Sequence, residues 1–210
     1  MAKSELAMPH ILKWEGGYSN HPKDKGGCTM KGITIATYKQ YYGNTKTCSD
    51  LQKLTDQEWL NIFKKGYWDK CKGDYILNQS IANIIVDWAW NSGVKTAIKE
   101  IQRILNIKDD GIVGEITLSS LNKQNQSELF NKIYKARVNF YINICEKDSS
   151  QKVFLNGWMN RINDFIFSEN ETPSENEIIE NENIQEESNE EIKKHFTDIM
   201  SDFSSAFLFK

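Results

Sequence analysis

Apolar residues recur at helical spacing along most of residues 4–167, and this pattern more than any other limits what the chain can fold into. Only three prolines occur in the chain, so few points force a helix to break. We therefore expect a mostly α fold. The clearest predicted helices cover residues 4–15, 80–93, 96–107, 127–148 and 153–167.

One glycine-rich stretch, Trp14–Thr34, interrupts the helical pattern. Gly16-Gly17 ends the first predicted helix, and the polar residues that follow favour a small irregular or β-hairpin segment. The stretch carries an acid, Glu15, a second acid nine residues later, Asp24, and a hydroxyl, Thr29. Most glycoside hydrolases use two carboxyl groups that flank the bond to be cleaved, and Glu15 and Asp24 could form such a pair. A solvated glutamate at a helix end is the competing interpretation of Glu15.

The charge distribution is uneven. The net charge is −3, and residues 168–191 hold ten Glu and no Lys or Arg, so the remainder carries +7. A basic surface suits an anionic polymer such as a cell wall, although scattered solvated lysines would give the same sum. Charge alone is weak support for nucleic-acid binding, and we predict none.

Cysteine and histidine positions give no metal-site spacing. Cys28, Cys48, Cys71 and Cys145 include no CxxC pair, and the three histidines are scattered, so we expect neither a metal nor a cofactor. Two disulfides would allow three pairings. Free buried thiols are the expectation for a chain made in the cytoplasm.

The two ends of the sequence suggest a particular setting. The start, MAKSELAMPHILKWEGG, shows no apolar signal-peptide core, and no run of residues is long and apolar enough for a membrane helix. Residues 168–191 are acidic and poor in large apolar residues, so we predict a disordered linker. Residues 192–210 regain apolar spacing and suggest an amphipathic helix that docks on the domain, on an unknown partner or on a membrane surface.

Two further stretches stand out. Asp87 lies in the most apolar predicted helix, so it requires a partner, and a structural hydrogen bond explains it better than catalysis. The DDGIVGEIT stretch at 109–117 combines turn glycines with polar residues and resembles a small peptidoglycan-binding module.

Several motifs together resemble glycoside hydrolase family 108, whose members are lysozyme-like muramidases. The N-terminal motifs are EGGY and D-x-GG-x-T-x-x-GIT, within residues 15–34. YW at 67–68, D-x-x-x-NSG from Asp87, DDGIVG and GW-x-x-R follow in the same order. The resemblance covers roughly residues 5–167. It implies a lysozyme-like catalytic module over 5–94 and a peptidoglycan-binding-like helical module over 95–167, packed on it.

The resemblance implies hydrolysis of the β-1,4 bond between N-acetylmuramic acid and N-acetylglucosamine in peptidoglycan glycan strands. Glu15 would be the general acid, Asp24 the second carboxylate, and Thr29 the hydroxyl that holds the water. Tyr18, Trp68 and Asn91 are the predicted substrate-binding residues. We expect a monomeric phage or prophage endolysin that reaches the wall or periplasm through a holin-type or other export route. The alternative is a non-catalytic peptidoglycan-binding or secretion-associated protein on the same fold.

Overall fold

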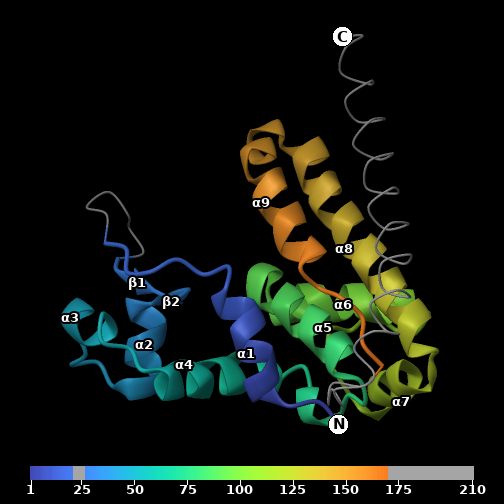
Figure 1. Ribbon diagram of the computed structural model, residues 1–210, viewed down its shortest axis with the longest axis horizontal. Coiled ribbons are helices and arrows are strands. Elements are labelled where there is room, and N and C mark those ends of the chain that lie inside the picture. Colours follow the sequence, from blue (N-terminus) through green and yellow to red (C-terminus); the bar gives the residue numbers. More distant parts are fainter. Residues whose placement is uncertain (21–26, 170–210) are drawn as a thin grey trace, which may run out of the picture. The chain divides into compact units, whose positions relative to one another are not determined.

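The structure is a computed structural model that describes residues 1–20 and 27–169. Residues Met1–Phe165 form one compact unit. It is mostly helical and has a small two-strand hairpin after the first helix (Figure 1). In chain order its first elements are α1 (Ser4–Leu12), β1 (Thr29–Met30), β2 (Ile33–Thr34), α2 (Ile35–Tyr42), α3 (Cys48–Leu51), α4 (Asp56–Phe63) and η1 (Lys64–Trp68). The remaining elements are η2 (Gly73–Tyr75), α5 (Gln79–Ser92), α6 (Val94–Ile104), α7 (Glu115–Lys123), α8 (Gln126–Lys147), η3 (Ser149–Gln151) and α9 (Lys152–Asn163).

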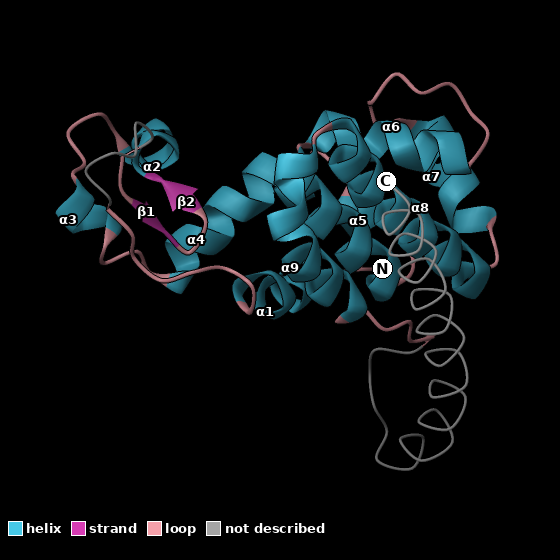
Figure 2. Ribbon diagram, turned by 90° about the horizontal axis from the view of Figure 1, so that it is seen from above, coloured by secondary structure: helices cyan, strands magenta, loops and turns pink. Residues whose placement is uncertain are grey.

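The hairpin lies within the predicted glycine-rich segment. Strands β1 and β2 pair antiparallel, with Thr29 opposite Thr34 and Met30 opposite Ile33. The turn between them is Lys31-Gly32, and both residues have positive φ, 48° and 76°. Two positive φ angles in a two-residue connection match the twist of an antiparallel pair, which is why a glycine is favoured here. Figure 2 shows the hairpin in magenta close to α2, which contacts β2, and α3, which contacts β1.

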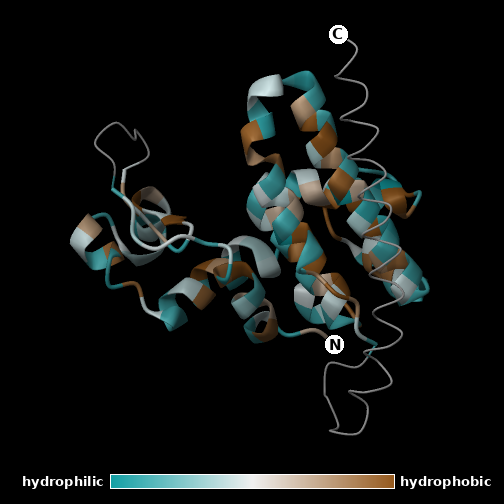
Figure 3. Ribbon diagram, turned by 45° about the horizontal axis from the view of Figure 1, so that its top comes forward, coloured by the Kyte–Doolittle hydropathy of each residue, from teal (hydrophilic) through white to brown (hydrophobic). Residues whose placement is uncertain are grey.

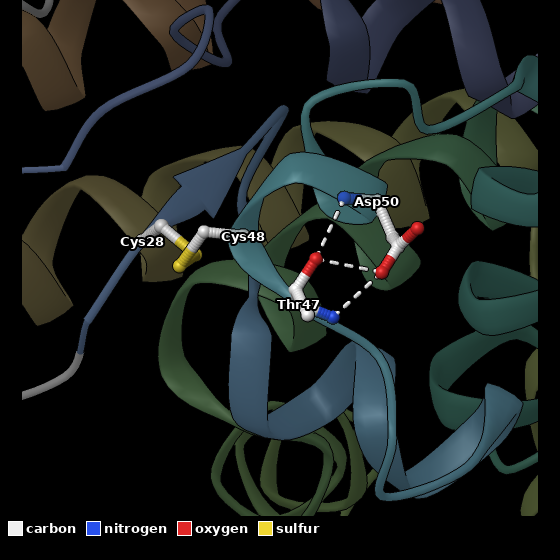
Figure 4. The surroundings of a disulfide bond; sticks show 4 residues. All are labelled: Cys28, Thr47, Cys48 and Asp50. Atoms are coloured by element: carbon white, nitrogen blue, oxygen red, sulfur yellow. Dashed lines mark hydrogen bonds between the residues drawn. A yellow bond between two sulfur atoms is a disulfide. The ribbon is translucent and has the colours of Figure 1, made fainter.

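A disulfide joins the residue before β1 to the first residue of α3. The Cα atoms of Cys28 and Cys48 are 5.8 Å apart, well within disulfide range (Figure 4). The expectation of four free thiols is therefore wrong for this pair, because the hairpin brings together two cysteines that are 20 residues apart. Cys71 and Cys145 are free and buried. The disulfide anchors the hairpin to the start of α3, where Thr47 and Asp50 form a capping box.

Helix α5 forms the centre of the core, as its apolar sequence predicts. Ile81, Ile84, Val86 and Trp88 are fully buried, and α5 contacts α1, α6, α8 and η1. The sequence predicts Ser80 as the N-cap of this helix. In the structure the helix begins at Gln79, and Asn78 accepts the capping hydrogen bond from the backbone of Ile81. In Figure 3 brown and teal residues alternate along the helices, which is the amphipathic pattern read from the sequence.

The ends of other helices differ from the predictions by a few residues. Helix α1 stops at Leu12 although the pattern suggested Glu15, and α9 stops at Asn163 although the pattern suggested 167. The sequence spacing of Thr55 and Glu58 predicts a capping box, and the structure confirms it at the start of α4. No helix in the described ranges is long and apolar enough to cross a membrane. The predicted acidic linker, apart from its first two residues, and the predicted C-terminal helix lie outside the described residues.

Candidate active site

Glu15 lies in a turn just beyond α1. The backbone of Trp14 bonds to Ile11 and that of Glu15 to Leu12, so the chain keeps turning for three residues after the helix ends. The Trp14 indole donates a hydrogen bond of 2.8 Å to Asp164, the residue after α9. This contact anchors the turn, so a residue that the sequence left at a frayed helix end is held in place.

The Glu15 carboxylate has two strong partners, and both act on the same oxygen. Oε1 accepts a hydrogen bond of 2.9 Å from Trp90 Nε1 in α5 and one of 2.8 Å from Arg161 Nη1 in α9. The Glu15 side chain is 15% exposed. Among the described residues no hydrogen bond reaches Oε2. The two donors therefore fix Oε1 and leave Oε2 without a donor from the described part of the chain.

The hairpin turn closes over that second oxygen. A Cβ built on Gly32 would lie 2.5 Å from Glu15 Oε2 and 2.8 Å from a ring carbon of Trp90, so only glycine fits. The Lys31 carbonyl accepts a hydrogen bond of 2.9 Å from the buried Trp59 indole, and the Lys31 amide donates one of 3.1 Å to Gly16. The turn is thus held against the loop that carries Glu15.

Thr29 lies on the same hairpin, which brings two of the predicted catalytic residues into one local structure. Its backbone exchanges hydrogen bonds of 2.8 and 2.9 Å with Ser19, the residue after Tyr18. Thr29 and Tyr18 are both partly exposed. Asp24, the predicted second carboxylate, lies outside the described residues.

Trp68 does not fit its predicted role in sugar binding, because its ring is fully buried. Its indole donates a hydrogen bond of 2.7 Å to Asp74, and this bond is the main reason that the pKa of Asp74 is lowered. The ring also packs against Gly73, where a Cβ would lie 2.3 Å from it. A glycan cannot reach Trp68, so its role is structural.

Two aromatic residues that were not assigned to the site lie beside Glu15 instead. Trp90 is partly exposed, and its ring centroid is 4.6 Å from that of Tyr67, which is also partly exposed. Burial raises the pKa of Tyr67, and the nearby Tyr41 and Glu15 add to the rise. From the sequence Trp90 is one of six aromatic residues that could stack on sugar rings, with only one or two expected in the groove, because helical spacing does not tell which tryptophan faces the carboxylate.

Asp87 is fully buried and has the hydrogen-bond partners that its place on an apolar helix requires. Its Oδ2 accepts a hydrogen bond of 2.5 Å from Arg137 Nη2, and its Oδ1 one of 2.6 Å from Arg161 Nη2. Although burial works against its charge, Asp87 and Glu15 hold the pKa of Arg161 above its ordinary value. Asn91, which is exposed, donates a hydrogen bond of 2.8 Å to the Asp87 carbonyl. Predicted to bind substrate, it lies at the edge of this network.

Arg161 therefore connects two carboxylates, and the sequence did not assign it a function. It appears there only as the last residue of the GW-x-x-R motif. Arg137 gave a clearer signal, because it lies among apolar residues of α8 and a buried arginine requires a carboxylate partner. The two arginines and the two acids, which we call the four-charge network, are Glu15, Asp87, Arg137 and Arg161.

Part of the DDGIVGEIT stretch is held by hydrogen bonds to one buried side chain. The buried Gln102 side chain donates hydrogen bonds to Asp110 and Thr117 and accepts one of 2.7 Å from the backbone of Gly111. Ile112 and Ile116, by contrast, are 70% and 73% exposed. Asp110, Gly111 and Thr117 thus hold a turn together around Gln102, and the turn also carries exposed apolar side chains.

Comparison with known proteins agrees with this architecture. Residues 8–93 match the family described as Glycosyl hydrolase 108, and residues 96–163 match the family described as Predicted Peptidoglycan domain. The two matches together define a glycoside hydrolase that acts on peptidoglycan. Residues 8–93 thus belong to the glycosyl hydrolase 108 family, and the peptidoglycan domain follows this segment at 96–163.

A solved structure supports the same assignment. The structure of Brucella abortus SagA is 28% identical to this chain, covers 81% of it and is itself covered to 98%, with a TM-score of 0.61. No curated protein shows a significant match to the chain.

Proposed function

We propose that the protein is a muramidase that cleaves the β-1,4 bond between N-acetylmuramic acid and N-acetylglucosamine, with Glu15 as the general acid. One observation carries the proposal. The Glu15 carboxylate, in the segment that matches glycosyl hydrolase 108, is held through Oε1 by two donors, and no described residue donates a hydrogen bond to Oε2, so this oxygen can carry a proton.

In the proposed reaction Glu15 Oε2 carries the proton and gives it to the glycosidic oxygen as the bond from that oxygen to the sugar carbon breaks. The leaving sugar departs as an alcohol, and a carboxylate remains on Glu15. Trp90 and Arg161 stabilise the negative charge that develops on this group, because both already donate hydrogen bonds to Oε1. A water molecule then adds to the sugar carbon, and the proton that it releases restores the acid form of Glu15, directly or through Asp24 and solvent.

The second carboxylate and the water-holding hydroxyl are assigned to Asp24 and Thr29. Asp24 would either activate the water or stabilise the positive charge on the sugar ring. This part of the proposal rests on the motif, since Asp24 is not among the described residues. Thr29 belongs to the hairpin whose turn lies against Glu15, which supports a place for its hydroxyl near the reacting bond.

The glycan would bind beside the acid. Trp90 and Tyr67 present partly exposed rings next to Glu15, and sugar rings stack their apolar faces on such side chains. Tyr18 and Asn91 remain proposed contacts at the edges of this surface. The proposed setting is a phage or prophage endolysin. A wall-remodelling protein of the host would use the same site.

The test is lysis of purified peptidoglycan by the wild-type chain and by Glu15→Gln, which keeps the shape but removes the proton. We expect a fall of roughly 100-fold or more in the rate of turbidity loss. Glu5→Gln, a change at an exposed glutamate in the first turn of α1, is the matched control and should leave the rate unchanged.

The reducing ends of the released fragments show which glycosidic bond is cleaved. A muramidase leaves reducing N-acetylmuramic acid ends, which mass spectrometry of the released fragments identifies. Reducing N-acetylglucosamine ends would contradict the proposed bond while leaving the protein a glycosidase. Wall binding without any lysis by the wild type would contradict catalysis and favour the non-catalytic alternative.

A further inference from the structure

Arg161 is placed to act on Glu15 from the segment that follows the hydrolase match. Glu15 and Arg161 are 146 residues apart in sequence. Residue 15 lies in the hydrolase match at 8–93 and residue 161 in the peptidoglycan-domain match at 96–163. Helix α9 thus delivers a charged group to the proposed catalytic acid. A domain that only bound the wall would not need such a contact.

The Arg161 guanidinium is itself tightly held. Its side chain is 8% exposed, and Nη1 donates a hydrogen bond to Glu15. Nε and Nη2 both donate to Oδ1 of Asp87, with distances of 3.0 Å for Nε and 2.6 Å for Nη2. This planar fork fixes the direction of the Nη1 donor, which a flexible ammonium group would not do. Arg137, which is fully buried, holds the far side of Asp87.

The two hydrogen bonds that hold Glu15, from Trp90 and from Arg161, both depend on residues of α5. Asp87 and Trp90 are three residues apart on that helix and so lie on neighbouring parts of its surface. Trp90 donates directly to Glu15 Oε1, and Asp87 acts on the same oxygen through Arg161. The Glu15 carboxylate is therefore oriented by one buried helix through two separate connections.

We propose that Arg161 is a positioning residue for Glu15, and that the segment at 96–163 completes the active site as well as contacting the wall. The inference rests on the proposed function, because it assigns Arg161 a role in the proton transfer by Glu15. Arg161 holds Oε1 so that Oε2 presents its proton to the glycosidic oxygen. It also stabilises the carboxylate left after the transfer.

The competing explanation is that the four-charge network only stabilises the fold. The two explanations differ in the kinetic constant that they affect. A positioning residue changes kcat and leaves KM almost unchanged, whereas a purely structural residue lowers the amount of folded protein without changing either constant per folded molecule.

The experiment compares full-length wild type, Arg161→Gln and Arg161→Lys on soluble, sonicated peptidoglycan, with thermal unfolding recorded for each chain. We expect kcat of Arg161→Gln to fall by about 100-fold, the usual effect of displacing a catalytic group by about 1 Å, while KM stays within about threefold. Arg161→Lys keeps the charge but not the fork, so it should recover part of the loss.

A matched control exists in a second ion pair that joins the turn after α1 to the end of α9. Lys13, next to the Glu15 turn, forms an ion pair of 2.6 Å with Asp164 after α9, and the Lys13 side chain is 62% exposed. Lys13→Gln therefore breaks an ion pair between the same two parts of the chain without touching Glu15. We expect its kcat to equal that of the wild type.

Each outcome has a consequence. If Arg161→Gln has the kcat of the wild type while Glu15→Gln is inactive, the role of Arg161 is refuted and the proposed function stands. A rise in KM at unchanged kcat would also overturn it, because Arg161 would then contact substrate. If Arg161→Gln does not fold, Arg161→Lys decides: we expect kcat to fall about tenfold, and a wild-type kcat would refute the role. No lysis by the wild type would overturn the proposed function and this inference with it.

Discussion

Gly32 offers the most direct test of the proposed site, because the structure states what an added methyl group would meet. In Gly32→Ala the new Cβ would lie 2.5 Å from Glu15 Oε2 and 2.8 Å from Trp90. Van der Waals contact needs about 3.5 Å, so the carboxylate has to move by roughly 1 Å. A displacement of that size typically costs about 100-fold in rate, which corresponds to about 2.7 kcal/mol of activation free energy.

The same substitution also strains the backbone, since the φ of Gly32 is 76°. An alanine in that conformation costs about 1 kcal/mol of folding free energy, or about 2–4 °C in the unfolding midpoint of a domain this large. Gly43→Ala separates the two effects. Gly43 has a φ of 103°, and a Cβ there would meet nothing within 4 Å, so it carries the backbone strain without the contact.

The assay is turbidity loss of purified peptidoglycan, with thermal unfolding of both variants beside it. We expect both chains to lose a few degrees and only Gly32→Ala to lose lysis. Wild-type lysis by a folded Gly32→Ala chain would refute the reasoning, because the working carboxylate could not then lie against the hairpin turn. Equal loss of lysis in Gly43→Ala would attribute the effect to backbone strain.

Three further predictions concern groups away from the proposed acid. Burial, with help from Glu58, raises the pKa of Tyr38 to about 12, so stability that is present below about pH 10, the unfolded value, should be lost as the pH rises towards 12. Urea unfolding at pH 9 and 11 checks this, and Tyr38→Phe should weaken the dependence. Burial also raises the pKa of Cys71 to about 12, so a thiol reagent should find no reactive thiol in the native chain, two in denaturant and four after reduction. Four thiols in denaturant without reductant would contradict the disulfide. Gln102→Leu removes the centre of the DDGIVGEIT turn and should cost roughly 2–4 kcal/mol in denaturant unfolding while leaving lysis per folded molecule unchanged; a loss of lysis instead would give the turn a catalytic role.

Local features of the fold could be predicted because neighbouring residues determine them. The burial of α5 follows from its apolar sequence, and the capping box at the start of α4 follows from the spacing of Thr55 and Glu58. The small hairpin after the first helix follows from the glycine-rich stretch at 14–34. In each case the residues that decide the structure lie within a few positions of each other.

The features of the site that could not be predicted from the sequence depend on contacts between distant segments. Arg161 meets Glu15 across 146 residues, and no local pattern reports that distance. Trp68 and Trp90 both lie at helical positions, and only the packing of η1 against α5 decides that Trp68 is buried while Trp90 reaches the acid. The pairing of Cys28 with Cys48 was one of several arrangements that the sequence left open.

The disulfide also makes the stability of the chain depend on its compartment. It closes a loop between residues 20 positions apart, and such a loop contributes about 3 kcal/mol by restricting the unfolded chain. That contribution exists only where thiols are oxidised. The restricted loop contains β1, β2 and the Lys31-Gly32 turn against Glu15. In a reducing cytoplasm the part of the molecule that meets the proposed acid is thus the part that loses its covalent support, and oxidation outside the cytoplasm restores it.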